Sequence, residues 1–152
     1  MSVTQELTQA FVDLIKSVHD DIISATGVEL NDPEGRFKHL PIGVKQIGVR
    51  DEGSLYSFGY QYLNLIEKHP DSPIDAAAFI IEEVAAKHYF WDGNKRTAFV
   101  FAGTFLRIRG IILEPDYLNV VDFLIKVAQG KSNKAEIKKW LLEHSTIIGG
   151  SK

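Results

Sequence analysis

The chain has 152 residues, of which 45% are hydrophobic and 24% charged, a balance typical of one globular domain. It contains no cysteine, which excludes disulfides and thiolate metal sites. No run approaches the roughly 18 apolar residues of a membrane span, and the first residues do not form a signal-peptide pattern. The net charge of −3 argues against broad nucleic-acid binding. We therefore expect a cytoplasmic protein with no membrane contact and no direct nucleic-acid binding.

The first predicted helix runs from about Thr4 to Ala25, with Thr4 as its N-cap and Gly27 as its stop. His19 lies one residue beyond the apolar face of this helix. That face is formed by apolar residues at spacings of three and four: Phe11, Leu14, Ile15, Val18 and Ile22.

Residues 27–54 change character, because they contain five glycines and two prolines. Such a stretch cannot form one helix. Its middle, about residues 42–50, combines β-branched residues with glycines and predicts a short hairpin or flap. A long structured loop in a compact domain is usually functional. A tolerated surface insertion is the alternative that composition leaves open.

Further helices are predicted along the rest of the chain. One covers Leu55 to Lys68, and the next begins with Ser72 as N-cap and Pro73 in its first turn. The small residues of the helix that begins at Pro73 favour a place in the middle of a bundle. Its apolar face includes Ile74, Ala77, Ala78, Ile81, Ala85 and His88.

Another helix follows Gly93, has an apolar face from Ala98 to Ile108 and ends at Gly110. The next is opened by residues 114–116 and stopped by Gly130. Asn133 with Glu136 resembles a capping box for the last helix, which ends at His144. We expect an all-α domain over residues 1–145, a bundle of about six helices, and a fraying tail over 146–152.

The segment from His88 to Arg96 carries the chemistry. A glycine-containing turn leads into a helix there, and the free N–H groups of a helix N-terminus bind phosphate. Lys95 and Arg96 add cations, and Asp92 supplies the hard oxygen that Mg²⁺ prefers. His88 can act as a base on a hydroxyl. Together these groups suit phosphoryl or nucleotidyl transfer.

A structural interpretation of the same residues stands beside the catalytic one. A single histidine on the apolar side of a helix is often a packed core residue, and Asp-Gly-Asn is an ordinary turn. Two cations at a helix start are often solvated. Their position is slightly unfavourable against the helix dipole, however, which favours an anion being bound there.

This segment resembles the signature of the Fic/Doc family, which is His-x-Phe-x-acid-small-Asn-x-Arg. Here those positions are His88, Phe90, Asp92, Gly93, Asn94 and Arg96. Asn94-Lys95-Arg96, in place of Asn-Gly-Arg, resembles the Doc branch of death-on-curing toxins. The resemblance extends to the segments 19–22, 48–55, 105–110 and 130–144, so it covers roughly residues 11–145.

The resemblance implies a role for each motif residue. His88 would be the general base on the target hydroxyl, Asp92 would hold Mg²⁺, and Phe90 would pin the loop in the core. ATP would be the substrate. The phosphate-binding residues would be Gly93, Asn94, Lys95 and Arg96.

The resemblance also implies a flap that lays the backbone of the target protein along the site. That flap would be Gly43, Val44, Lys45, Gln46, Ile47, Gly48, Val49 and Arg50.

Departures from the usual Fic pattern favour phosphorylation over AMP transfer. Lys95 replaces a glycine, and Phe99 stands where a second phosphate-binding arginine is usual. The chain also lacks a recognisable inhibitory Ser/Thr-x-x-x-Glu helix. The resemblance then implies a toxin that phosphorylates Ser or Thr of a protein such as a translation factor. It also implies a separate antitoxin. AMP transfer, and a catalytically silent binding module with the same fold, are the competing hypotheses.

Overall fold

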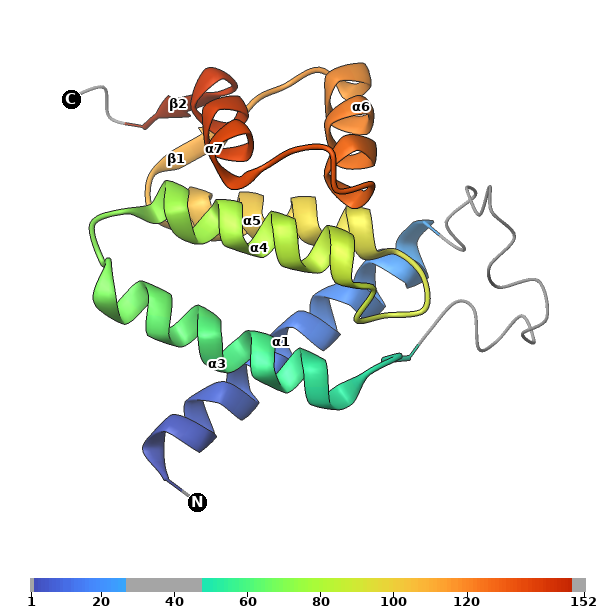
Figure 1. Cartoon of the computed structure of the whole chain (residues 1–152), viewed down its shortest axis with the longest axis vertical. Helices are drawn as coiled ribbons and strands as arrows, with labels where there is room; N and C mark the ends of the chain where they lie inside the picture. The colour runs from blue at the N-terminus through green and yellow to red at the C-terminus, as the bar shows by residue number, and fades with distance from the viewer. Residues whose placement is uncertain (1, 27–47, 149–152) are drawn as a thin grey trace.

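The computed structural model describes residues 2–26 and 48–148. Within these ranges the chain forms a helical bundle with a short two-stranded antiparallel sheet, which confirms the predicted all-α class (Figure 1). The elements are α1 (Val3–Thr26), α3 (Glu52–Lys68), α4 (Pro73–Lys87), α5 (Asn94–Ile108), β1 (Ile111–Leu113), α6 (Tyr117–Ala128), α7 (Lys134–Glu143) and β2 (Ser145–Ile147).

Helices α4 and α5 form the centre of the bundle and pack against each other along their lengths. Helices α1 and α3 lie on one side of this pair, and α6 and α7 lie on the other (Figure 1). None of the helices in the described ranges combines the length and apolar character needed to cross a membrane.

Helix α4 is central because its sequence is small and apolar. Ala76, Ala77, Ala78 and Ala85 are buried, together with Ile80, Ile81 and Val84. Alanine lets neighbouring backbones approach closely, so one helix can contact α3, α5, α6 and α7. The predicted place of this helix in the middle of the bundle is confirmed.

The buried face of α1 differs from the predicted one. Leu14 is exposed, while His19 is buried on the same face as Ile15. The buried positions of this helix repeat at helical spacing: Thr8, Phe11, Val12, Ile15, His19 and Ile23. The hydrophobic pattern did not place His19 on the buried face. A buried histidine needs a polar partner, and here that partner belongs to a distant part of the chain, which a local pattern does not show.

The helix caps follow local sequence, with one correction. Ser2 caps α1, since its Oγ accepts from the N–H of Gln5 at 3.1 Å and its own N–H donates to Gln5 Oε1 at 2.8 Å. The predicted Thr4 cap is therefore wrong. The predicted capping box of Asn133 and Glu136 at α7 is confirmed.

The tail over residues 146–152 was predicted to fray, which is wrong for residues 146–148, and residues 149–152 lie outside the described residues. Strand β2 pairs with β1 in the register Ile111↔Ile147, Ile112↔Thr146 and Leu113↔Ser145. Ile148 N–H then donates to the carbonyl of Gly110 at 2.7 Å. β-Branched residues on both partners favour the extended conformation, and the turn at Gly110 brings β1 back to the end of α7.

Candidate active site

The motif residues 88–96 lie where α4 ends and α5 begins, beside the C-terminal half of α1 (Figure 1). His88 is the C-cap of α4 and adopts the left-handed conformation, with φ 55° and ψ 52°. Among the described residues, it alone combines a positive φ with a side chain. Such strain persists only where the surrounding structure holds it in place, and it is concentrated at functional sites.

Arg50 holds the backbone around His88. Its Nε donates to the His88 carbonyl at 2.7 Å, and its Nη2 donates to the Lys87 carbonyl at 3.4 Å. Its own N–H donates to the Tyr89 carbonyl at 2.7 Å. These bonds satisfy carbonyls that the end of a helix leaves unpaired. Arg50 therefore fixes the turn on which the histidine side chain is mounted.

Only part of the predicted flap can be placed. Gly48, Val49 and Arg50 are described, and Val49 forms an isolated antiparallel bridge with Phe90. The segment 43–47 lies outside the described residues, as does the predicted stop Gly27. The end of the predicted flap segment therefore runs directly against the motif, through Val49 and Arg50.

Tyr89, for which the sequence suggested no role, is a buried structural residue. Its hydroxyl donates to Glu83 Oε1 at 2.8 Å, and its ring packs against Phe58. Burial, with the Glu83 carboxylate beside it, raises the pKa of Tyr89 far above its ordinary value. The phenol therefore stays neutral and acts as a donor at physiological pH.

Asn94 closes the loop on itself. Its Oδ1 accepts from the Phe90 N–H at 3.0 Å, and its Nδ2 donates to the Phe90 carbonyl at 2.9 Å. Both residues are buried, so these bonds satisfy backbone groups that water does not reach. The side chain of Asn94 is thus used within the protein, which leaves its backbone N–H as the group available to a phosphate.

The start of α5 lacks the usual partners of a helix N-terminus. Gly93 is the N-cap, and no side-chain cap is found for α5 among the described residues. The first turn contains no acid but holds Lys95 and Arg96. The Nη1 atom of Arg96 is buried and has no hydrogen-bond partner within the described ranges. An unpaired buried guanidinium nitrogen beside a positive helix end indicates a place for an anion.

Asp92 lies beside the start of α5 and is buried, and its Oδ1 accepts from the Gly93 N–H at 2.8 Å. Across the described ranges, no cluster of at least three His, Asp or Glu residues forms a metal cage. One carboxylate fits a Mg²⁺ ion that takes most of its ligands from nucleotide phosphates and water. The residues present are thus compatible with Mg²⁺ arriving as a nucleotide complex.

His19 is the residue of this site that the hydrophobic pattern did not identify. Its ring stacks on Phe90 with centroids 3.9 Å apart, and its Nε2 lies 2.7 Å from the Asp92 carbonyl oxygen. The available signal was the titratable residue at the edge of an apolar helix face, together with the resemblance of residues 19–22 to the family's first helix.

Phe99 is half-buried and packs against the core, and its uncharged ring brings no cation to the site.

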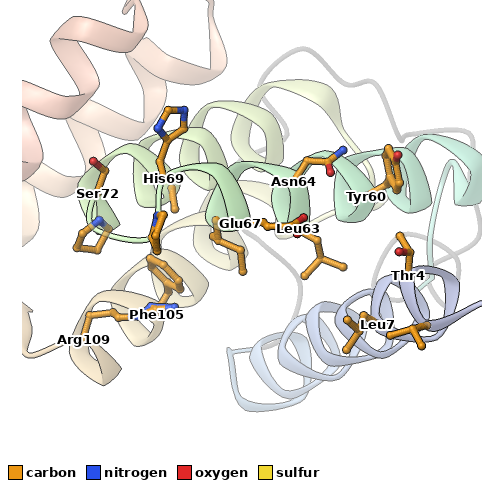
Figure 2. Close-up of a pocket in the computed structure, with 15 residues that line it drawn as sticks. Thr4, Leu7, Tyr60, Leu63, Asn64, Glu67, His69, Ser72, Phe105 and Arg109 are labelled. Atoms are coloured by element: carbon orange, nitrogen blue, oxygen red, sulfur yellow. The ribbon is translucent and has the colours of Figure 1, made fainter.

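The groove in Figure 2 is separate from the motif. The groove has a volume of about 550 Å³ and is lined by residues such as Leu7, Leu63 and Phe105. These residues belong to α1, α3 and α5, and none of residues 88–96 lines the groove. We therefore do not assign it to the chemistry.

Gly93→Ala is expected to destabilise the protein more than the same change at a comparable glycine. Gly93 has φ 76°, and a Cβ there would lie 2.9 Å from Ile23 Cδ1. The left-handed conformation costs an alanine roughly 1–2 kcal/mol, and the contact with Ile23 adds to this. Urea denaturation measures the difference in the free energy of unfolding.

Gly130→Ala is the matched control for this prediction. Gly130 has φ 74°, but a Cβ there meets nothing within 4 Å. The excess loss at Gly93 should shrink when Ile23 is changed to valine, which lacks the clashing Cδ1 atom. Equal losses at Gly93 and Gly130 would show that the close approach of α1 to the motif is unimportant.

The comparisons with known proteins agree with this arrangement. The Fic/DOC family model matches residues 7–106, which include most of α1, all of α3 and α4, the motif and most of α5. The chain belongs to the Fic/DOC family. Among curated proteins it is similar to "Toxin Doc" of Mycolicibacterium smegmatis, with 46% identity over 43 residues. That match covers 28% of this chain and spans only 33% of the length of the relative.

Proposed function

We propose that this protein is a Doc-like toxin, an enzyme that transfers phosphate from ATP to a Ser or Thr hydroxyl of a target protein. The observation that carries the proposal is the uncapped start of α5 with the unpaired, buried Nη1 atom of Arg96. Membership of the Fic/DOC family and similarity to a protein named as a Doc toxin support it.

The proposed reaction assigns one task to each group. The backbone N–H groups that begin α5, with Arg96, bind the phosphates of the nucleotide. His88 accepts the proton of the target hydroxyl as its oxygen bonds to the γ-phosphorus. The bond from that phosphorus to the β–γ bridging oxygen breaks, and ADP leaves with the electron pair. Mg²⁺, held by Asp92 and phosphate oxygens, would offset the charge of the phosphates.

The choice of the γ-phosphate rests on Lys95 and Phe99. A lysine charge lies within the first turn of α5, while position 99 holds a packed aromatic ring instead of a cation. Compared with the usual Fic pattern, the nucleotide thus gains the Lys95 cation as an anchor and lacks the arginine at position 99. A charged hydrogen bond contributes about 1.5–3 kcal/mol, enough to favour one orientation of the triphosphate over its reverse.

The partners follow from the same proposal. The substrate is a protein whose backbone lies against the segment that ends at Val49 and Arg50. A toxin also needs a partner that restrains it, so we propose a separate antitoxin, as the name of the Mycolicibacterium relative suggests.

Labelled ATP tests which group moves. The protein is incubated with a cell lysate, Mg²⁺ and ATP labelled at either the γ- or the α-phosphate. We expect one protein to acquire the γ-label and to gain the mass of one phosphate at Ser or Thr. His88→Asn is the control and should leave the lysate unlabelled.

The other outcomes overturn the proposal. Transfer of the α-label, with the mass of one AMP, would show nucleotidyl transfer. No transfer of either label, together with no Mg²⁺-dependent nucleotide binding by the protein alone, would indicate a silent module that keeps only the fold.

A further inference from the structure

The Asp92–Gly93 peptide is held at its carbonyl by a residue far away in the sequence, and at its N–H by the side chain of Asp92 itself. Its carbonyl oxygen lies 2.7 Å from His19 Nε2, and its N–H donates to the carboxylate of Asp92 at 2.8 Å. This peptide joins the carboxylate assigned to Mg²⁺ to the N-cap of α5, which is assigned to phosphate. Its orientation therefore sets the direction of both groups.

The contact between His19 and this carbonyl defines where the imidazole proton resides. A carbonyl oxygen only accepts hydrogen bonds, so Nε2 carries the proton and donates it. The other nitrogen, Nδ1, is buried with no hydrogen-bond partner within the described ranges, and Asp20 Oδ1 lies 3.5 Å away. The donor at Nε2 is thus required whether or not Nδ1 is protonated.

The ring of His19 is held so that it can make this one bond. It is 1% exposed and lies nearly parallel to the ring of Phe90, with an angle of 8° between the planes. Gly93 packs against it, since a Cβ there would lie 3.5 Å from Nε2. The ring is therefore held with its Nε2 edge toward the Asp92 carbonyl.

We propose that His19 is a positioning residue of the active site, which orients the Asp92 carboxylate and the first N–H groups of α5 through the Asp92–Gly93 peptide. The inference rests on the proposed function in that it assumes a Mg²⁺–nucleotide complex at this site. It does not depend on which phosphate is transferred.

The first test needs no reaction. Nitrogen-15 NMR of the imidazoles in the wild-type protein should show that His19 carries its proton on Nε2, with slow exchange of that proton. A His19 ring protonated only on Nδ1 would overturn the proposal, because no donor would then face the Asp92 carbonyl.

The second test measures binding of Mg²⁺–ADP to the isolated protein by calorimetry. His19→Phe keeps an aromatic ring against Phe90 but removes the donor, and we expect about ten- to a hundredfold weaker binding, as for other partners that orient a metal ligand. Ile15→Val is the control, because Ile15 is buried on the same face of α1, one turn away. It should lower the melting temperature without changing the affinity.

A second pair of variants keeps the test decisive if His19→Phe does not fold. The amide nitrogen of His19→Gln can reach the place of Nε2, whereas that of His19→Asn is too short. We expect His19→Gln to retain most of the Mg²⁺–ADP affinity and His19→Asn to lose it. Equal affinities in these two variants, or an unchanged affinity in His19→Phe, would show that His19 is merely structural. Failure of the labelled-ATP test alone would not alter these binding results.

Discussion

Replacing His88 with alanine is expected to slow transfer to the target protein by about a hundredfold or more while leaving the fold intact. The histidine is the proposed general base, and its backbone is held independently of its side chain, through the Arg50 hydrogen bonds to the carbonyls of Lys87 and His88. Those contacts survive removal of the imidazole. The measurement is the initial rate of label transfer, with circular dichroism as the check on folding.

The variant His88→Asn separates chemistry from backbone strain. His88 has φ 55°, a conformation that asparagine adopts more readily than most residues with a side chain. We expect His88→Asn to fold at least as well as His88→Ala and to be equally inactive. Transfer at the wild-type rate in either variant would mean that another group is the base.

Replacing Asn94 with alanine is expected to lower the free energy of unfolding by about 2–6 kcal/mol. The change strands the N–H and the carbonyl of Phe90, and each buried group left without its partner costs roughly 1–3 kcal/mol. Urea denaturation measures the loss. The main role expected for the Asn94 side chain is therefore to close the loop through Phe90. Any contribution of the Asn94 backbone N–H to phosphate binding is separate from this role.

Two further variants sharpen this prediction. Asn94→Asp keeps the acceptor for the Phe90 N–H but sets an oxygen against the Phe90 carbonyl, so it should also destabilise the protein. Arg96→Gln should instead weaken nucleotide binding and leave stability nearly unchanged, because Arg96 Nη1 has no hydrogen-bond partner within the described ranges. If Asn94→Ala were as stable as the wild type, the loop would not depend on this side chain.

Local features of the sequence predicted the helices, because the signals that begin and end a helix lie within a few residues of each other. Pro73 opens α4, and Asn133 with Glu136 caps α7 as expected. The motif was visible for the same reason, since the residues from His88 to Arg96 are consecutive. The motif could therefore be located from the sequence, and the range that the family model matches includes it.

The contacts that orient the site could not be predicted in this way. Arg50 and His88 are 38 residues apart, and His19 and Asp92 are 73 apart. No local periodicity specifies such pairs, because they form only when packing brings the helices together. The pairing of β1 with β2 is of the same kind, since a short strand has no stable conformation without its partner.

By itself, the sequence determined which segments are helical, which residues carry charge at the start of α5, and which family signature the chain contains. The tertiary structure decided that His19 is buried against Phe90 and that Arg50 holds the turn at His88. It also decided that the Asn94 side chain hydrogen-bonds to the backbone of Phe90. The reason is that buried polar groups must find partners, and where those partners lie depends on how α1, α4 and α5 pack.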